Sequence, residues 1–346
     1  MADRKGRKAD ITAVARAARV SPSTVSRSFN HPELVKPATR IRIEAAVRRL
    51  GYIRNRAAQT IHGIRSGTIG VIVPTIDQAI FAELIQSFSS AVEELGFTIL
   101  LASHGYSLER EYALARKMLE HRVDGLCLVG LEHSADAYEL IAQQGVPALL
   151  LWNYAQDAPL PCVGSDNYRA GYLIGQHVAE LGHASIAAIF PPLGGNDRAA
   201  HRMAGVIDAL GDAGRAIRPD WHLETPYAIA SAKAAVQGLI TAADRPTALI
   251  CGNDVLAWGA LHALSRAGIG VPDEMTVTGI GDFSGSRDFE PALTTVRIPA
   301  GAIGRQAADG IVRLITSAGE ARVGSLVMPE LVVRRTSGAP GGDPAG

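Results

Sequence analysis

The chain of 346 residues has few of the features that mark exported, membrane-bound or disulfide-stabilised proteins. Its N-terminus is basic but has no apolar signal-peptide core, and no run approaches the roughly 18 apolar residues of a membrane-spanning helix. We therefore expect a cytoplasmic protein that makes no contact with a membrane. Its three cysteines lie in or beside apolar runs, and we expect reduced core side chains at Cys127, Cys162 and Cys251.

Motifs of the common enzyme classes are also missing. The chain contains no HExxH zinc motif, no phosphate-binding P-loop and no GxSxG nucleophile motif, and its ten histidines are scattered. The fragment Gly279-x-Gly281 is too short for a dinucleotide site. We therefore predict no catalytic residues, no metal and no cofactor, although a deep cleft of the kind inferred below also suits sugar kinases and isomerases.

The chain as a whole has no net charge, because 34 Lys/Arg balance 34 Asp/Glu, but the two signs are unevenly distributed along it. Residues 1–66 carry 15 Lys/Arg and 4 Asp/Glu, a net charge of +11, whereas the remaining residues carry 19 and 30, a net charge of −11. Such asymmetry suggests a nucleic-acid-binding module joined to a different domain. A solvated basic tail would show the same excess, so the distinction depends on whether the segment folds.

The basic segment has the pattern of a folded unit. Asp10 is a good N-cap for a first helix, whose apolar residues recur at i, i+3, i+4 and i+7 and are Ile11, Val14, Ala15 and Ala18. Ser21 caps a second helix with Pro22 at its first position, and its expected buried stripe is Val25 and Phe29. A third helix spans residues 37–50 and ends at Gly51, and its expected inward residues are Ile41, Ala45 and Leu50.

Two short helices joined by a tight turn, with a third helix closing the core, form a helix-turn-helix. The second helix presents small polar residues and Arg27 at its exposed N-terminal half, which suits the reading of base edges in a DNA major groove. Any three-helix bundle has polar outer faces, but the excess of 11 positive charges favours DNA as the partner.

Two stretches of this segment closely resemble the headpiece and hinge of LacI/GalR-type transcriptional repressors. They are residues 20–27 (VSPSTVSR) and residues 50–58 (LGYIRNRAA), and they occur at the family's spacing and in its order. The resemblance implies that Pro22, Ser23 and Arg27 face bases, while Ser21 and Thr24 lie nearer to phosphates. It also implies a bacterial, nucleoid-associated homodimer on double-stranded operator DNA, since two-fold symmetry matches a palindromic operator.

The resemblance further implies a hinge helix over residues 55–63 that becomes ordered only on operator DNA. Its predicted DNA-binding positions are Asn55, Arg56, Ala58 and Ile61. Ile61 stands where family members insert a leucine between base pairs and bend the duplex. Packing of Ile61 against the hinge of a second subunit is an equally good interpretation, and the two do not exclude each other.

From Thr68 onward, apolar strands alternate with amphipathic helices, which is typical of a parallel sheet covered on both faces. About 280 residues are too many for one layered core, so we expect two similar α/β lobes, in agreement with the family's periplasmic-binding-protein-like core. The predicted fold is α plus α/β, with a helix-turn-helix headpiece (1–53), a hinge (54–66) and a two-lobed core (67–336). The N-lobe would comprise residues 67–163 and 297–325, and the C-lobe residues 164–296 and 326–336. Residues 337–346 are rich in Gly and Pro and are predicted to be a disordered tail without a tetramerising helix.

Open parallel sheets bind ligands beyond the carboxyl ends of their strands, so two facing lobes form a cleft there. The effector-binding candidates are the residues at these strand ends: Thr75, Asp77, Phe81, His104, Asn153, Asp166, Arg202, Asn253, Asp254 and Asp282. The resemblance identifies Arg202 as an effector-binding arginine, the pair Asn253-Asp254 as a cleft motif, and Phe81 as an aromatic that closes over the ligand. Helix capping is the alternative role for Asp166 and Asp254, and a plain surface position is the alternative for His104.

The residue at position 281, a glycine, bears on the charge of the ligand. In many sugar-responsive family members an Asp follows the strand 276–280 directly and holds sugar hydroxyls, whereas here the Asp comes one residue later, as Asp282. The loss of a cleft carboxylate removes repulsion toward an anionic ligand. Residues 80–84 (IFAEL) and 104–106 (HGY) also resemble the gluconate-responsive branch of the family, so a sugar acid such as gluconate is the predicted effector.

These observations predict a DNA-binding repressor of a carbohydrate or sugar-acid catabolic operon that leaves its operator when the effector binds. If the ligand instead binds more tightly to the DNA-bound state, it acts as a co-repressor and strengthens operator binding. The sequence does not show which of the two states the ligand prefers. A sugar-binding protein or enzyme with the same two-lobed cleft is a further alternative, but it gives no reason for a basic headpiece. An architectural DNA-binding protein would show no response to any small molecule.

Overall fold

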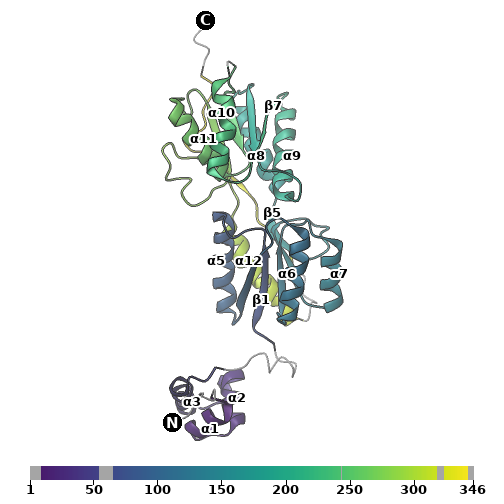
Figure 1. Cartoon of the computed structure of the whole chain (residues 1–346), viewed down its shortest axis with the longest axis vertical. Coiled ribbons are helices and arrows are strands. Elements are labelled where there is room, and N and C mark those ends of the chain that lie inside the picture. Colours follow the sequence, from purple (N-terminus) through teal and green to yellow (C-terminus); the bar gives the residue numbers. More distant parts are fainter. Residues whose placement is uncertain (1–8, 54–64, 243, 318–322, 342–346) are drawn as a thin grey trace, which may run out of the picture. The chain divides into compact units, whose positions relative to one another are not determined.

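The computed structural model describes residues 9–53, 65–242, 244–317 and 323–341. The chain forms two compact units, residues 1–66 and residues 67–346, and both can be followed in Figure 1. In these described ranges we find no helix that is long and apolar enough to cross a membrane. The same ranges hold no group of three or more His, Cys, Asp or Glu side chains arranged to bind a metal ion.

The first unit is a bundle of α-helices with one short 3-10 turn. Helix α1 (Ile11–Ala18) begins at Asp10, whose carboxylate accepts the backbone N–H of Ala13 at 2.7 Å. Helix α2 (Pro22–Asn30) begins at Ser21, whose hydroxyl accepts the N–H of Thr24 at 3.2 Å. The turn η1 (Pro32–Leu34) leads to α3 (Pro37–Leu50), which ends at Gly51 in the left-handed conformation. The predicted starts and ends of these helices are confirmed.

The buried face of α3 differs from the prediction. Ile43 and Ala46 are buried, whereas Ile41 is 67 % exposed and both Ala45 and Leu50 are exposed. Apolar side chains lie on two sides of this helix, so periodicity alone cannot choose between them. The packing of α3 in the bundle selects the side that carries Ile43 and Ala46.

The N-lobe of the second unit is built on a parallel sheet with the strand order β11-β5-β4-β3-β1-β2. Its strands are β1 (Thr68–Val73), β2 (Thr98–Ser103), β3 (Gly125–Val129), β4 (Ala148–Asn153), β5 (Cys162–Ser165) and β11 (Ser325–Leu326). One face is covered by α5 (Ala79–Glu94) and α12 (Ala300–Thr316), and the other by α6 (Leu108–Glu120) and α7 (Ala135–Gln144), as Figure 1 shows.

The C-lobe repeats this arrangement with the strand order β12-β10-β9-β8-β6-β7, in which only the pair β10–β12 is antiparallel. Its strands are β6 (Ile186–Phe190), β7 (Ile217–Glu224), β8 (Ala248–Cys251), β9 (Thr276–Gly281), β10 (Thr294–Arg297) and β12 (Glu330–Val332). Its helices are α8 (Asn167–Glu180) and α9 (Asp197–Asp212) on one face, and α10 (Ile229–Thr241) and α11 (Asp254–Ala267) on the other.

The chain passes from one lobe to the other after β5, β10 and β11. One hydrophobic cluster extends through both lobes and includes Trp152, Phe283 and Ile298 near the crossings. The predicted two-lobed α/β fold is thus confirmed. Strands β5, β7, β10, β11 and β12 and helix α12 were not predicted. Four of these strands are very short, and β7 is an edge strand of largely exposed residues.

All three cysteines are buried and free, in agreement with the sequence analysis. Burial raises the pKa of the Cys127 and Cys251 thiols above their ordinary value. Because the reactive form of a cysteine is the thiolate, these two side chains are unreactive parts of the core.

Residues 337–341 contradict the prediction of a disordered tail over residues 337–346, and residues 342–346 lie outside the described part of the chain. Ser337 Oγ lies 2.9 Å from Nε2 of His177, and the carbonyl oxygen of Gly338 lies 2.9 Å from Nε2 of His183. The backbone N–H of Gly338 also donates to the hydroxyl of Thr276 at 3.0 Å. Composition predicted disorder because the segment has few apolar residues. Hydrogen-bonding groups of the C-lobe hold its backbone instead.

Deletion of residues 337–346 should lower the free energy of unfolding by about 2–4 kcal/mol, because several hydrogen bonds with a net value of about 1 kcal/mol each are lost. Urea unfolding followed by circular dichroism measures this change. Deletion of residues 342–346 alone is the matched control, since it removes none of these bonds, and should leave the midpoint unchanged. Equal midpoints for all three proteins would contradict a stabilising role for residues 337–341.

Candidate functional site

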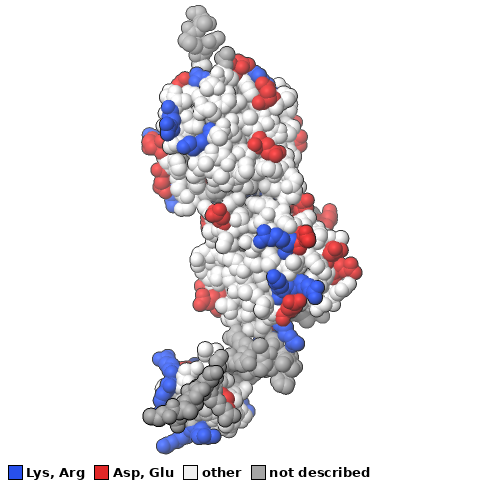
Figure 2. Space-filling model, in the orientation of Figure 1, with Lys and Arg blue, Asp and Glu red and all other residues white. Residues whose placement is uncertain are grey.

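The start of α2 carries the residues that were predicted to contact DNA. Pro22, Ser23 and Arg27 are exposed, and the Ser21 hydroxyl lies 2.8 Å from the hydroxyls of Ser23 and Thr24. These hydroxyls surround a helix N-terminus, where backbone N–H groups favour a phosphate. Figure 2 shows Lys and Arg side chains on the surface of this unit. The predicted hinge positions Asn55, Arg56, Ala58 and Ile61 lie outside the described residues.

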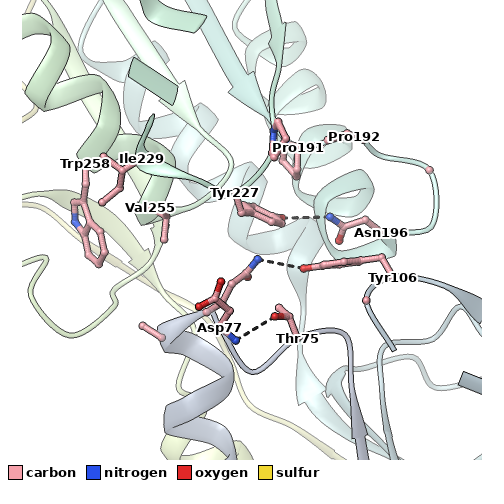
Figure 3. Close-up of a pocket in the computed structure, with 15 residues that line it drawn as sticks. Thr75, Asp77, Tyr106, Pro191, Pro192, Asn196, Tyr227, Ile229, Val255 and Trp258 are labelled. Atoms are coloured by element: carbon pink, nitrogen blue, oxygen red, sulfur yellow. Dashed lines mark hydrogen bonds between the residues drawn. The ribbon is translucent and has the colours of Figure 1, made fainter. Parts of the chain in front are cut away.

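A cavity of about 630 Å³ lies between the two lobes of the core (Figure 3). The N-lobe lines it with the segments that follow β1 and β2, and the C-lobe with the segments that follow β6, β7 and β8. Its position at the carboxyl ends of these strands is the one expected for an α/β ligand site, and its volume is in the range of small-molecule pockets. The lining residues with polar side-chain atoms are Thr75, Asp77, Gln78, Tyr106, Asn196, Tyr227 and Trp258.

Hydrogen bonds between lining side chains order the cavity wall, and Figure 3 draws them as dashed lines. Gln78 Nε2 donates to the hydroxyl of Tyr106 at 3.2 Å within the N-lobe. Asn196 Nδ2 donates to the hydroxyl of Tyr227 at 3.4 Å within the C-lobe. Each lobe therefore presents an amide and a phenol, which suit a ligand with several hydroxyl groups.

A much smaller recess, of about 20 Å³, shares Gln78, Tyr106 and Tyr227 with the lining of this cavity. Its lining residues are Gln78, Phe81, Tyr106, Trp152, Arg198, Arg202, Tyr227, Asn253 and Phe283. Arg202 is only 5 % exposed, and its Nε donates to Oδ1 of Asn167 at 2.8 Å. Its Nη1 donates to the carbonyl oxygen of Gly252 at 3.1 Å. Aromatic rings and the buried guanidinium groups of Arg198 and Arg202 thus line the recess.

Arg202 forms no ion pair with any residue that the structure describes. Burial lowers the pKa of its guanidinium from the ordinary value. Arg198, one turn earlier on α9, is in contrast paired with Asp197 at 2.8 Å. Because an uncompensated buried charge is costly, an anion in the recess would stabilise the site, and a planar guanidinium suits a carboxylate best.

Two glycines determine where Arg202 lies. A Cβ atom on Gly171 of α8 would be 1.9 Å from the carbonyl oxygen of Arg202, and one on Gly205 of α9 would be 2.0 Å from the carbonyl oxygen of Tyr168. Neither site accepts a side chain unless the two helices separate. The close contact therefore sets the position of the Arg202 backbone, and from there its side chain reaches Asn167 at the start of α8.

The structure brings several predicted effector residues together. Thr75 and Asp77 line the cavity, and Phe81, Arg202 and Asn253 line the recess. The ring of Phe81 packs edge-on against that of Trp152, with centroids 5.7 Å apart. Asn153 does not line either space, because its amide is bonded to side chains behind the recess.

Asp254 lies within the protein and not in the cavity. Its carboxylate accepts hydrogen bonds from the Phe283 backbone, the Ser286 hydroxyl and the Thr295 hydroxyl at 2.6–2.8 Å. Burial is the largest cause of its raised pKa, and the three hydrogen bonds oppose that shift. The alternative of helix capping is also wrong for Asp254, because the side chain of Asn253 caps α11. Asp254 therefore holds the segment after β9 in place.

Three further candidates lie outside the cavity lining. Asp166 caps α8, which agrees with the alternative given for it, and Asp282 forms ion pairs with two arginines. His104 is 5 % exposed and lies 3.8 Å from Glu111, so a plain surface position is wrong for it. Burial is the largest cause of the lowered pKa of the His104 imidazole.

Several residues around the cavity were missed in the sequence analysis: Gln78, Tyr106, Trp152, Asn196, Arg198, Tyr227, Trp258 and Phe283. Arg198 could have been found, since it lies four residues before Arg202 on the same predicted helix. Tyr106 belongs to the HGY motif that was noted for its resemblance alone. Tyr227 could not be identified from the sequence, because it follows β7, an edge strand that the hydrophobic pattern does not indicate.

Comparison with known families assigns both units. Residues 66–331 match the model described as periplasmic binding proteins and sugar binding domain of LacI family. Residues 10–55 match the model described as bacterial regulatory proteins, lacI family.

Individual proteins match over almost the whole chain. The HTH-type transcriptional repressor PurR of Klebsiella pneumoniae is 30 % identical over 330 residues, which cover 95 % of this chain and 96 % of PurR. A crystal structure of a LacI-family transcriptional regulator from Silicibacter pomeroyi superposes with a TM-score of 0.84 at 25 % identity, over 95 % of this chain and 99 % of that one. The lac repressor dimer bound to operator and the anti-inducer ONPF superposes with a TM-score of 0.83 at 27 % identity, over 96 % of this chain and 100 % of that one.

Gly205→Ala should lower the free energy of unfolding by about 1–3 kcal/mol, because the new methyl group overpacks the contact between α8 and α9. Gly211→Ala on the same helix is the matched control. A Cβ there meets open space, so stability should stay the same or rise by up to about 1 kcal/mol. Urea denaturation measures the free energy of unfolding of both variants. An unchanged value for Gly205→Ala would show that the two helices can separate without loss of stability.

Proposed function

Because the chain belongs to the LacI family of bacterial regulatory proteins, we propose that it represses a sugar-acid catabolic operon and leaves its palindromic operator when a sugar acid such as gluconate binds. The protein is a DNA-binding transcriptional repressor with a sugar-binding domain, and its homologues are repressors and not enzymes. LacI-family repressors bind operator DNA as dimers and bind small-molecule effectors in the sugar-binding domain. In the proposal it acts in the cytoplasm, on the nucleoid.

The unpaired guanidinium of Arg202 carries the proposal of an anionic effector. Among the residues that line the cavity and the recess, Asp77 alone has a carboxylate, whereas Arg198 and Arg202 both have a guanidinium. An effector carboxylate on Arg202 would replace the missing ion-pair partner in a site that excludes water, where charge-assisted hydrogen bonds are strong.

The surroundings of Gly281 support a ligand other than a neutral sugar. A Cβ atom at Gly281 would lie 2.0 Å from the ring of Phe283, which lines the recess. An aromatic ring therefore fills the place where many sugar-responsive relatives carry an acidic side chain. The face of such a ring packs against the carbon chain of a polyol, and the ring carries no formal negative charge, unlike the carboxylate it replaces.

The remaining polar groups fit the body of an aldonate. Thr75, Gln78 and Asn196 offer a hydroxyl and two amides to ligand hydroxyls along the cavity wall. Phe81 and Tyr106, which line the recess, come from the two stretches that resemble the gluconate-responsive branch. Gluconate has a carboxylate at one end and hydroxyls along the rest of its chain, so it matches this distribution of groups.

The effect on DNA follows from linkage. An effector changes operator affinity only if it prefers one arrangement of the lobes, and hence one spacing of the paired hinges. We propose release, in which the headpiece residues Ser21, Pro22, Ser23, Thr24 and Arg27 leave the operator together with the hinge residues Asn55, Arg56, Ala58 and Ile61.

Gluconate should release the protein from the DNA upstream of its own gene in a gel shift, and it should raise the thermal midpoint of the protein, whereas glucose should do neither. Arg202→Gln should raise the gluconate Kd at least about tenfold, because a charge-assisted bond is lost, and should retain DNA binding. Stabilisation by neutral hexoses but not by aldonates would contradict the sugar-acid effector. Tighter DNA binding in the presence of gluconate would make the effector a co-repressor.

Arg27→Ala should weaken operator binding by about 1–3 kcal/mol and relax the base preference, because a bidentate contact to a base edge is lost. Arg49→Ala is the control, since it removes an equal charge from an exposed site on a different helix, α3. Gel shifts with operator variants and with unrelated DNA measure both effects. A uniform loss of affinity on all DNA would instead make Arg27 a phosphate contact.

A further inference from the structure

A continuous series of side-chain hydrogen bonds runs from Arg202 to the place where the two lobes meet. Arg202 Nε donates to Asn167 Oδ1 at 2.8 Å, and Asn167 Nδ2 donates to Asn153 Oδ1 at 2.9 Å. Asn153 Nδ2 donates in turn to Asp197 Oδ2 at 2.8 Å. The same oxygen accepts the backbone N–H of Leu131 at 2.7 Å. We call the two asparagines the amide relay, and the bonds from Asn153 and Leu131 to Asp197 the interlobe contact.

These bonds connect the lobes directly. Asn153 ends β4 and Leu131 follows β3, so both belong to the N-lobe, whereas Asn167 begins α8 and Asp197 begins α9 in the C-lobe. The asparagines are 1 % and 2 % exposed, so water does not compete for their hydrogen bonds. The side chain of Asp197 is 10 % exposed and is also paired with Arg198.

The two charged ends fix the orientation of both amides. A guanidinium can only donate hydrogen bonds and an ionised carboxylate can only accept them. Each amide must therefore turn its oxygen toward Arg202 and its NH₂ group toward Asp197. Rotation of either amide would bring donor against donor on one side and acceptor against acceptor on the other, so the relay has a single favourable arrangement.

We propose that the amide relay couples effector binding at Arg202 to the interlobe contact at Asp197. This inference rests on the proposed function, in which the effector carboxylate binds Arg202. A carboxylate in the recess competes with Asn167 for the guanidinium, and the weakened bond leaves Asn153 and Asp197 free to separate. Asn153, Asn167 and Asp197 are positioning residues, since none of them lines the cavity or the recess.

Hydrogen exchange of the Leu131 amide in the full-length protein tests the relay without any ligand. Asp197→Ala removes the acceptor and should accelerate this exchange at least about tenfold. Asn167→Asp retains the oxygen that accepts from Arg202 but loses the donor to Asn153. Although it does not touch Leu131, it should accelerate the exchange about threefold or more. Tyr168→Phe is the matched control one residue further along α8, where a bond to Asp208 is lost, and should leave Leu131 unchanged.

Global loss of stability is recognised from the amides of β6, which serve as the reference in every variant. Arg202→Gln repeats the test from the far end of the relay if Asn167→Asp does not fold. Accelerated exchange of Leu131 in Asp197→Ala, together with wild-type exchange in Asn167→Asp and in Arg202→Gln, would overturn the proposal. The interlobe contact would then be independent of Arg202.

Gluconate separates failure of this inference from failure of the proposed effector. If gluconate does not shift the thermal midpoint of the wild type, the effector assignment fails, while the exchange experiment still decides whether the relay is coupled. If gluconate binds, Asn153→Ala should keep its Kd within about threefold and lose most of the gluconate-dependent release from DNA. Full release of DNA by gluconate in Asn153→Ala would overturn the coupling.

Discussion

The backbone contact between α8 and α9 is the constraint on which the cleft depends. Gly171 and Gly205 allow the two helices to approach until carbonyl oxygens occupy the space of side chains. Helix α9 then carries Asp197 to the N-lobe, Arg198 to within 6.0 Å of the Tyr106 ring centroid, and Arg202 to the end of the recess. A small displacement of this one helix would move the interlobe contact and the ligand arginine together.

Charge acts at two scales in this protein. The excess of +11 in residues 1–66 attracts DNA, while the −11 of the remaining chain is repelled by it, which helps to confine contact to the headpiece. Inside the acidic core, however, the recess has the opposite local charge because Arg202 has no acidic partner among the described residues. Net charge therefore identifies the DNA-binding unit but gives no information about the effector.

Much of the fold could be predicted because it follows from local chemistry. Caps such as Asp10 and Ser21 and long apolar strands produce the helices and sheets wherever they occur. The predictions were wrong where contacts with residues distant in the sequence determine which side chains are buried or ordered. The buried face of α3 is chosen by the rest of the bundle, and residues 337–341 are ordered by hydrogen bonds to His177, His183 and Thr276.

The sequence by itself determined that a basic helix-turn-helix precedes two α/β lobes, and it predicted that Arg202 and Asn253 belong to the cleft between them. A strand end places Asn253 without knowledge of its neighbours, whereas the family resemblance singled out Arg202, which lies inside α9. Only the tertiary structure decided how each polar group is used. Asp254 is taken up by three protein hydrogen bonds, Arg202 has no ion-pair partner among the described residues, and two asparagines link it to Asp197. Hydrogen-bond partners depend on which residues fold against one another, and that information is not local in the chain.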